Sequence, residues 1–89
     1  GLYSISGDVA PLREIAAACR EAGAMLMVYE AHSFGVYGRR GLGWAEAEGV
    51  IDQVDVIVWT FSKALAGIGG FALSRHPELK YLHFAARPY

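Results

Sequence analysis

The sequence predicts an α/β fold with about four strands, mostly parallel and with the last one antiparallel, flanked by helices. The continuous apolar run 24–29 and the largely apolar segment 54–60 have the length of strands and suit strands buried on both faces, as in parallel sheets. An amphipathic stretch before the first run provides a crossover helix. Residues 71–74 follow the second run too closely for another crossover, so this strand is expected to run antiparallel.

Local signals justify the elements of the first third of the chain. Residues 2–5 form a short β-type run that a turn follows. Pro11 can open a helix, which carries apolar side chains at helical spacing until Gly23 ends it. Together with the run at 24–29, these elements predict one right-handed βαβ unit.

Glycine shapes the rest of the chain. Residues 30–43 form a loop that is too long for a simple connection, and such loops are often functional. A short helix is expected over 44–48, and a glycine-rich turn over 61–70 joins the last two strands. A final helix is expected from Pro77 to Ala86.

Composition narrows the class of protein. The chain has 89 residues, of which 54% are apolar and 19% charged, with a net charge of −1. This excludes a disordered polymer, and the absence of a basic stripe argues against a nucleic-acid partner. No apolar run reaches the roughly 18 residues of a membrane span. The single cysteine cannot form an internal disulfide, so a cytoplasmic location is expected.

Both ends of the sequence look cut from a longer chain. Residues 1–89 are therefore expected to be a single fragment of one domain, because domains usually have about 100–150 residues. A few strands of a larger sheet leave their outer edges unpaired, and such edges can pair with another chain. Self-association through these edges is therefore expected.

Polar side chains follow three of the predicted strands. The first strand ends at Ser4, the second is followed by His32, and the third is followed by Thr60, Ser62 and Lys63. Ligands of open α/β sheets bind beyond the carboxyl ends of the strands. We therefore expect these side chains to converge on one rim of the sheet.

Lys63 is the most informative of these residues. Partial desolvation at a strand end favours the neutral, nucleophilic amine that a Schiff base needs, although a solvated lysine is the plainer alternative. Thr60 and Ser62 can hold a phosphate or simply form the turn, and His32 can orient a cofactor or be a surface group. The histidines and the one cysteine lack the spacing of metal ligands, so no metal site is expected.

Several short motifs occur together, and their combination is more specific than any one of them. They are Gly7-Asp8-Val9-Ala10-Pro11-Leu12, Glu30-Ala31-His32-Ser33-Phe34-Gly35, Gly41-Leu42-Gly43, Thr60-Phe61-Ser62-Lys63-Ala64-Leu65 and Gly69-Gly70-Phe71. In this order they resemble the α-oxoamine synthase family of pyridoxal-phosphate enzymes. The tail, Arg75-His76-Pro77-Glu78-Leu79-Lys80-Tyr81-Leu82 with Arg87-Pro88-Tyr89, is most similar to the bacterial serine palmitoyltransferases of that family.

The resemblance implies the middle of a fold-type-I large domain, with pyridoxal 5'-phosphate as cofactor. It implies that Lys63 forms the Schiff base with the cofactor and handles protons, and that His32 contacts the cofactor's phenolic oxygen. Thr60 and Ser62 would lie beside the cofactor and its phosphate, and Ser4 would line the site. The implied enzyme is a homodimer that condenses L-serine with a long-chain acyl-CoA and releases carbon dioxide, a step of sphingolipid biosynthesis.

Two residues depart from the family pattern. Tyr29 stands where the family has an aspartate that pairs with the pyridine nitrogen, and a neutral phenol cannot supply that fixed negative charge. Trp59 stands where a small residue is usual. One interpretation is that the chain is a segment of the acyltransferase. It would be inactive as an isolated chain, whether or not it binds the cofactor. The alternatives are an excised or engineered non-catalytic α/β module whose cofactor pocket is filled by Tyr29 and Trp59, and new carbonyl chemistry by Lys63 with Tyr29.

Overall fold

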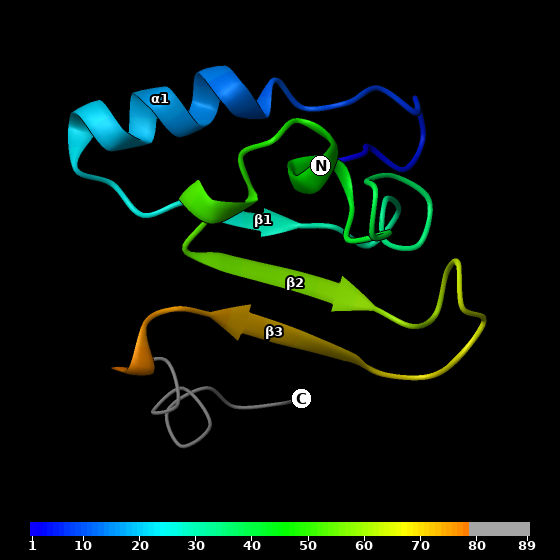
Figure 1. Cartoon of the computed structure of the whole chain (residues 1–89). Coiled ribbons are helices and arrows are strands. Elements are labelled where there is room, and N and C mark those ends of the chain that lie inside the picture. The colour runs from blue at the N-terminus through cyan, green and yellow to red at the C-terminus, as the bar shows by residue number, and fades with distance from the viewer. Residues whose placement is uncertain (79–89) are drawn as a thin grey trace.

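A mixed three-stranded sheet forms the centre of the computed structural model, which describes residues 1–78 (Figure 1). Its strands are β1 (Met27–Tyr29), β2 (Val56–Thr60) and β3 (Gly70–Ser74), in the order β1-β2-β3. β1 and β2 are parallel, and β3 is antiparallel to β2. The predicted α/β class and the antiparallel last strand are therefore confirmed.

The crossover helix α1 (Leu12–Ala22) forms where the sequence predicts it. It buries Leu12 and Ala16, and it ends at Gly23, which adopts the left-handed conformation with φ 67° that glycine tolerates best. Among residues 1–78, no helix is both long and apolar enough to cross a membrane. The helix predicted from Pro77 to Ala86 falls almost wholly outside the described residues.

Two short helices connect the long loop to β2. They are α2 (Trp44–Ala47) and the 3-10 helix η1 (Ile51–Gln53). The first of them confirms the helix predicted over 44–48, shortened by one residue. In Figure 1 both are seen between α1 and β2.

The predicted strand at residues 2–5 is wrong. The segment makes only an isolated antiparallel bridge between Leu2 and Val9, and the Tyr3 N–H donates to the carbonyl oxygen of Asp8 at 2.8 Å. The turn-forming Gly7 folds the segment back on itself before it can pair along β1. The described part of the chain therefore has three strands rather than four, and the βαβ unit lacks its first strand.

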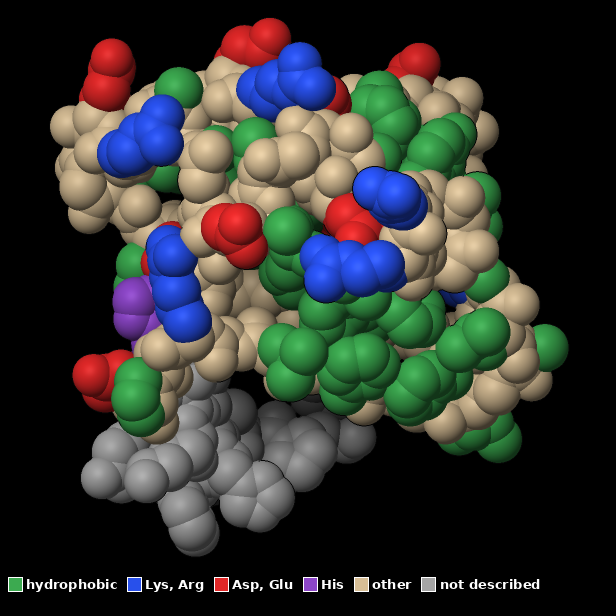
Figure 2. Space-filling view, in the orientation of Figure 1, with side chains coloured by type: hydrophobic (Ala, Val, Ile, Leu, Met, Phe, Trp, Pro, Cys, Tyr) green, Lys and Arg blue, Asp and Glu red, His purple; other side chains and the backbone are tan. Residues whose placement is uncertain are grey.

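The two faces of the sheet differ in burial. Because alternate residues of a strand point to opposite faces, Val28, Ile57 and Trp59 lie on one face, where all three are buried. Met27 and Tyr29 lie on the other face and are 67% and 54% exposed. The core comprises Ala10, Leu12, Ala16, Leu26, Val28, Ala45, Val50, Val54, Ile57 and Trp59. Apolar side chains also reach the surface over β2 and β3 (Figure 2).

Asp55, just before β2, forms hydrogen bonds with the residue before β1 and with the residues that follow β3. Its Oδ2 accepts the backbone N–H of Leu26 at 2.8 Å, and its Oδ1 lies 2.7 Å from His76 Nε2 and 3.3 Å from Arg75 Nη2. The hydrogen bond with His76, then that with Leu26 and the Arg75 guanidinium, lower the pKa of Asp55 to about 2. The ionised carboxylate therefore stabilises the junction of all three strands.

We expect the free energy of unfolding to fall as the pH drops from about 4 to about 2. The carboxyl group is ionised in the folded chain until the pH approaches 2, whereas in the unfolded chain it takes up a proton near its ordinary pKa of 3.8. Urea titrations at several pH values measure this slope. Asp55→Asn should flatten it, and Asp52→Asn should not, because Asp52 contacts Arg75 through its backbone carbonyl oxygen. Equal slopes in the two variants would contradict the assignment.

Candidate active site

The candidate site residues gather at one end of the sheet. β1 and β2 are parallel neighbours, so their carboxyl ends meet at the same edge. His32 comes three residues after β1, Thr60 ends β2, and Lys63 follows Thr60 by three residues. The structure therefore places His32, and the group Thr60, Ser62 and Lys63, at one rim of the sheet, in two adjacent loops (Figure 1).

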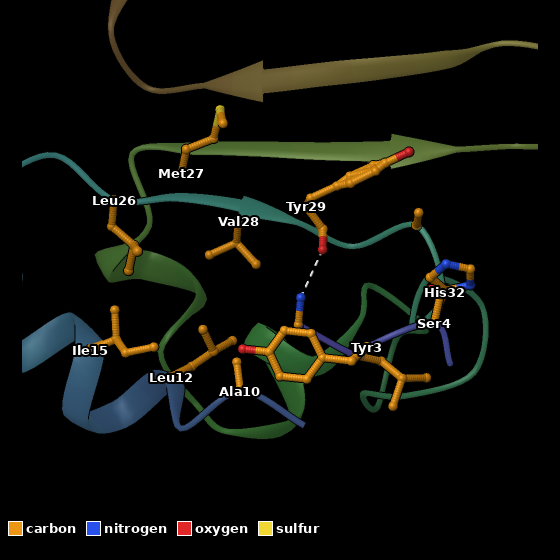
Figure 3. Close-up of a pocket in the computed structure, with 13 residues that line it drawn as sticks. Tyr3, Ser4, Ala10, Leu12, Ile15, Leu26, Met27, Val28, Tyr29 and His32 are labelled. Carbon is orange, nitrogen blue, oxygen red and sulfur yellow. Dashed lines mark hydrogen bonds between the residues drawn. The ribbon is translucent and has the colours of Figure 1, made fainter. Parts of the chain in front are cut away.

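Ser4 and His32 line a cavity of about 430 Å³ beside the free edge of β1 (Figure 3). The cavity lies between the N-terminal segment, α1 and β1, and its walls are mostly apolar. Its lining residues are Gly1, Leu2, Tyr3, Ser4, Ala10, Leu12, Ile15, Leu26, Met27, Val28, Tyr29, Ala31 and His32. Thr60, Ser62 and Lys63 are not among these lining residues. The five predicted residues thus divide into a Ser4–His32 group and a Thr60–Ser62–Lys63 group.

The hydroxyl groups of Thr60 and Ser62 form a hydrogen-bonded pair. Their oxygens are 2.9 Å apart, and Thr60 Oγ1 donates to the carbonyl oxygen of Gly69 at 3.1 Å. Because Thr60 has one hydroxyl proton, it accepts from Ser62 Oγ as well as from the Ser62 backbone N–H at 3.3 Å. This closes the turn of residues 61–69, which we call the lysine turn.

Lys63 is exposed on the lysine turn, which agrees with the solvated alternative rather than with a desolvated amine. The chain turns directly after β2, and the polar Ser62 and the small Ala64 flank the lysine without covering it. Its amine is therefore open to a ligand from solvent, and the bonds of the turn fix its backbone. The Ala66 N–H, for example, donates to the Lys63 carbonyl oxygen at 3.1 Å.

The loop that carries His32 touches the lysine turn. We call residues 30–43 the glycine loop. At Gly35 an added Cβ would lie only 3.2 Å from the Cβ of Ala64, the neighbour of Lys63, and the backbone there has a φ of +82°. A residue without a side chain therefore lets the two loops meet. Gly35 therefore allows the contact between the two loops, a role that the position of this glycine in the sequence does not show.

Glu30 is a buried anchor that sequence reasoning missed. Its side chain is fully buried, and its carboxylate accepts from Ser33 Oγ at 2.9 Å and from the Ala45 N–H at 2.8 Å. It also lies 3.0 Å from the Gly1 nitrogen. An added Cβ at Gly43 would overlap the carboxylate, so the loop closes around it. The sequence does carry a signal for this role. Glu30 directly follows an apolar strand, Ser33 follows it by three residues, and the small Gly43 ends the loop.

Glu46 closes the other side of the glycine loop. Its carboxylate accepts the backbone N–H of Arg40 at 2.9 Å and of Leu42 at 3.2 Å, and it pairs with the Arg40 side chain. Partial desolvation alone would raise the pKa of Glu46, but the bonds from Arg40 and Leu42 outweigh it and lower this pKa. Two carboxylates thus hold the loop. Glu30 binds near its start, at Ser33, and Glu46 binds near its end, at Arg40 and Leu42.

Tyr29 and Trp59 do not share a pocket, which corrects the interpretation that both fill the cofactor site. Tyr29 pairs in register with Val58, so it shares a face with Thr60, and Trp59 lies on the opposite face. Trp59 is 4% exposed and donates its indole N–H to the Leu42 carbonyl oxygen at 2.8 Å. Figure 3 shows the ring of Tyr29 on the side of β1 away from α1. Trp59 is therefore a core residue, and only Tyr29 faces the open side.

Metal ligands do not gather in the described part of the chain. Residues 1–78 contain no group of three or more His, Cys, Asp or Glu side chains placed to hold a metal ion. The chemistry that the rim offers is that of a primary amine, two hydroxyl groups and an imidazole.

Comparisons with known proteins point to one group of enzymes. The chain is 56% identical over 89 residues to a serine palmitoyltransferase of Caulobacter vibrioides, and it is 45% identical over 89 residues to an 8-amino-7-oxononanoate synthase of Geobacter metallireducens. In each case the match covers 100% of this chain and 22% or 23% of the relative. The chain thus spans less than a quarter of the length of these relatives.

A solved structure gives the same result for the fold. A serine palmitoyltransferase structure, described with its pyridoxal phosphate internal aldimine, superimposes with a TM-score of 0.92 at 47% identity. That match covers 100% of this chain and 22% of the solved one. The sequence profile of the family described as aminotransferase class I and II matches residues 2–89, and the chain belongs to this family.

Proposed function

We propose that this chain is a segment of a pyridoxal-phosphate-dependent acyltransferase that condenses L-serine with a long-chain acyl-CoA and releases carbon dioxide. The observation that carries the proposal is the placement of Lys63. Its open amine follows the bonded hydroxyl groups of Thr60 and Ser62, at the same end of the sheet as His32. The 56% identity to the serine palmitoyltransferase of Caulobacter vibrioides supports serine as the amino acid.

The residues of the lysine turn fit the cofactor. Lys63 would hold it covalently through its amine, and the hydroxyls of Thr60 and Ser62 would donate to its phosphate in place of their present contacts with Gly69 and with each other. His32, from the adjacent loop, would hydrogen-bond a polar ring substituent. When bound, pyridoxal phosphate supplies an electron sink for negative charge at the α-carbon of an amino acid. Lys63, once released from the cofactor, would move the proton at that carbon.

Tyr29 limits what the segment does alone. It is the large side chain on the face that also carries Thr60, and a phenol is neutral at pH 7. It therefore gives the site no fixed negative charge. We propose that the isolated 89-residue chain does not turn over serine and acyl-CoA, and that the remaining groups come from the rest of a longer, cytoplasmic, homodimeric protein.

Reaction with pyridoxal phosphate followed by borohydride reduction tests the role of Lys63. The sequence has two lysines, Lys63 and Lys80, so Lys80 is an internal reference that mass spectrometry reads in the same sample. We expect Lys63 to be labelled roughly tenfold more than Lys80 with pyridoxal phosphate, because a charge-assisted hydrogen bond is worth about 1.5–3 kcal/mol. Pyridoxal, which lacks the phosphate, should lose most of this preference.

Variants of the hydroxyl pair complete the test. Ser62→Ala should reduce the preference for pyridoxal phosphate over pyridoxal at Lys63, and Ser6→Ala, on the N-terminal turn, should leave it unchanged. Equal labelling of both lysines, with no effect of the phosphate, would reject the proposal. That result would favour the non-catalytic module, for which Lys63 is an ordinary solvated amine.

A further inference from the structure

We propose that Trp59 is a positioning residue, which sets the glycine loop against the lysine turn and so places His32 relative to Lys63. Trp59 touches neither of these residues; it acts through the aromatic side chains of three segments. The inference rests on the proposed function for its chemical meaning, but the geometry that it predicts can be measured without any cofactor.

Trp59 belongs to a cluster of four aromatic rings, in which it contacts Phe34 and Phe71 and Phe71 contacts the other three. Its ring centroid is 5.7 Å from that of Phe34 and 4.9 Å from that of Phe71, and Phe71 is 5.3 Å from Phe61. Phe34 and Phe71 also meet edge to face at 6.1 Å. Separations of 4.5–7 Å are those of favourable aromatic pairs. One cluster thus joins the glycine loop, the end of β2 and the start of β3.

The indole N–H adds a directional contact to this packing. It donates to the carbonyl oxygen of Leu42 at 2.8 Å, near the returning end of the glycine loop. Phe34 lies near the start of the same loop, and the Gly35 N–H donates to the Gly41 carbonyl oxygen at 2.8 Å, which closes the loop between these points. Trp59 therefore contacts the glycine loop near both of its ends, at Phe34 and at Leu42.

The same cluster reaches the lysine turn by two routes. Phe61 directly follows Thr60, and its backbone N–H and carbonyl oxygen bond Gly69 and Gly67, which fixes the turn. Phe34 precedes Gly35, where an added Cβ would lie only 3.2 Å from the Cβ of Ala64, so the two loops are in close contact there. A shift of the Trp59 ring would therefore move Gly35 and Ala64 relative to one another, and Ala64 is the neighbour of Lys63.

Trp44 offers a matched control within the same chain. Its indole N–H also donates to a backbone carbonyl oxygen, that of Ala10 at 3.0 Å, and its ring also packs edge to face on an aromatic ring, that of Tyr37. Trp44 is half-buried against the core. Its ring contacts Tyr37 of the glycine loop, a packing that phenylalanine keeps, but its hydrogen bond leads to the N-terminal segment. Tryptophan-to-phenylalanine changes at 44 and 59 therefore remove the same kind of bond in different places.

The experiment compares Trp59→Phe with Trp44→Phe in two measurements. The first is the Lys63-to-Lys80 labelling ratio with pyridoxal phosphate, at a temperature where circular dichroism shows both variants folded. The second is the amide NMR spectrum without cofactor, with hydrogen exchange at Gly35. We expect Trp59→Phe to lower the ratio at least threefold, to shift the Gly35 and Ala64 amide signals and to speed exchange at Gly35. Trp44→Phe should change none of these.

The outcomes separate this inference from the proposed function. Loss of lysine selectivity in the unsubstituted chain would reject the function, and the Gly35 and Ala64 amide signals would still decide the role of Trp59. Equal effects of both variants, or unchanged signals in Trp59→Phe, would overturn the positioning role. Phe34→Leu, made in parallel, removes the loop's ring from the cluster; it should reproduce the shifts at Ala64 even where Trp59→Phe fails to fold.

Discussion

Replacing Trp59 by glycine is expected to lower the free energy of unfolding by about 3–5 kcal/mol, the usual cost of truncating a buried aromatic side chain. Trp59 is 4% exposed and packs against Phe34 and Phe71, so the change opens a large cavity at the centre of the core. It also leaves the Leu42 carbonyl oxygen without the indole donor. Glycine in a strand interior adds a further backbone entropy cost.

Tyr29→Asp is the contrasting change on the neighbouring strand. Tyr29 is 54% exposed and its ring lies on the open face, so we expect this substitution to change stability by only about 1 kcal/mol, the range of exposed strand positions. A chain of 89 residues has a total stability of roughly 4–13 kcal/mol, so Trp59→Gly removes a large share of it. Urea denaturation followed by circular dichroism measures both variants.

The two single variants also separate two explanations for the aromatic residues. If Tyr29 and Trp59 filled one pocket together, each would stabilise the other, and the effects of the two changes would not add. Because the structure places them on opposite faces, we expect the double variant to show the sum of the two single effects within about 0.5 kcal/mol. A large deviation from this sum would restore the shared pocket.

The elements that the sequence predicts well are those fixed by local chemistry. The helix from Leu12 to Ala22 has an apolar stripe and a glycine stop, and β1 and β2 form within the two apolar segments, although β1 buries only Val28. The antiparallel β3 follows from the shortness of the lysine turn. The strand at residues 2–5 fails because its pairing depends on a partner in space, and its own turn offers a closer one.

The candidate site is predictable in its position but not in its arrangement. Parallel strands bring the residues that follow them to one edge, which places His32 and Lys63 at the same end. Whether a side chain near the end of a strand is buried depends on which face of the sheet it points to, and this alternates from one residue to the next. That parity puts Trp59 in the core and Tyr29 outside, although both look alike in the sequence as aromatic residues at a strand end. Burial of Glu30 likewise depends on where the glycine loop returns.

Glu30→Ala is expected to destabilise the chain by about 1–3 kcal/mol for each buried donor that loses its acceptor, namely the Ser33 hydroxyl and the Ala45 N–H. The carboxylate accepts from the Ser33 hydroxyl and the Ala45 N–H in buried contacts, and it lies 3.0 Å from the Gly1 nitrogen. Alanine supplies no acceptor to any of them. The loss should also loosen the glycine loop, since Glu30 lies between β1 and His32.

A glutamate at the surface provides the matched control for this change. Glu48 forms an ion pair with Arg13, whose side chain is 66% exposed, and such a pair is worth about 0–1 kcal/mol, so Glu48→Ala should have little effect. Glu30→Gln keeps the shape and one acceptor oxygen, so its stability should fall between those of Glu30→Ala and the unchanged chain. Equal urea midpoints for Glu30→Ala and Glu48→Ala would show that the buried carboxylate does not hold the loop. In that case the position of the glycine loop against the lysine turn would depend on Glu46 and the aromatic cluster.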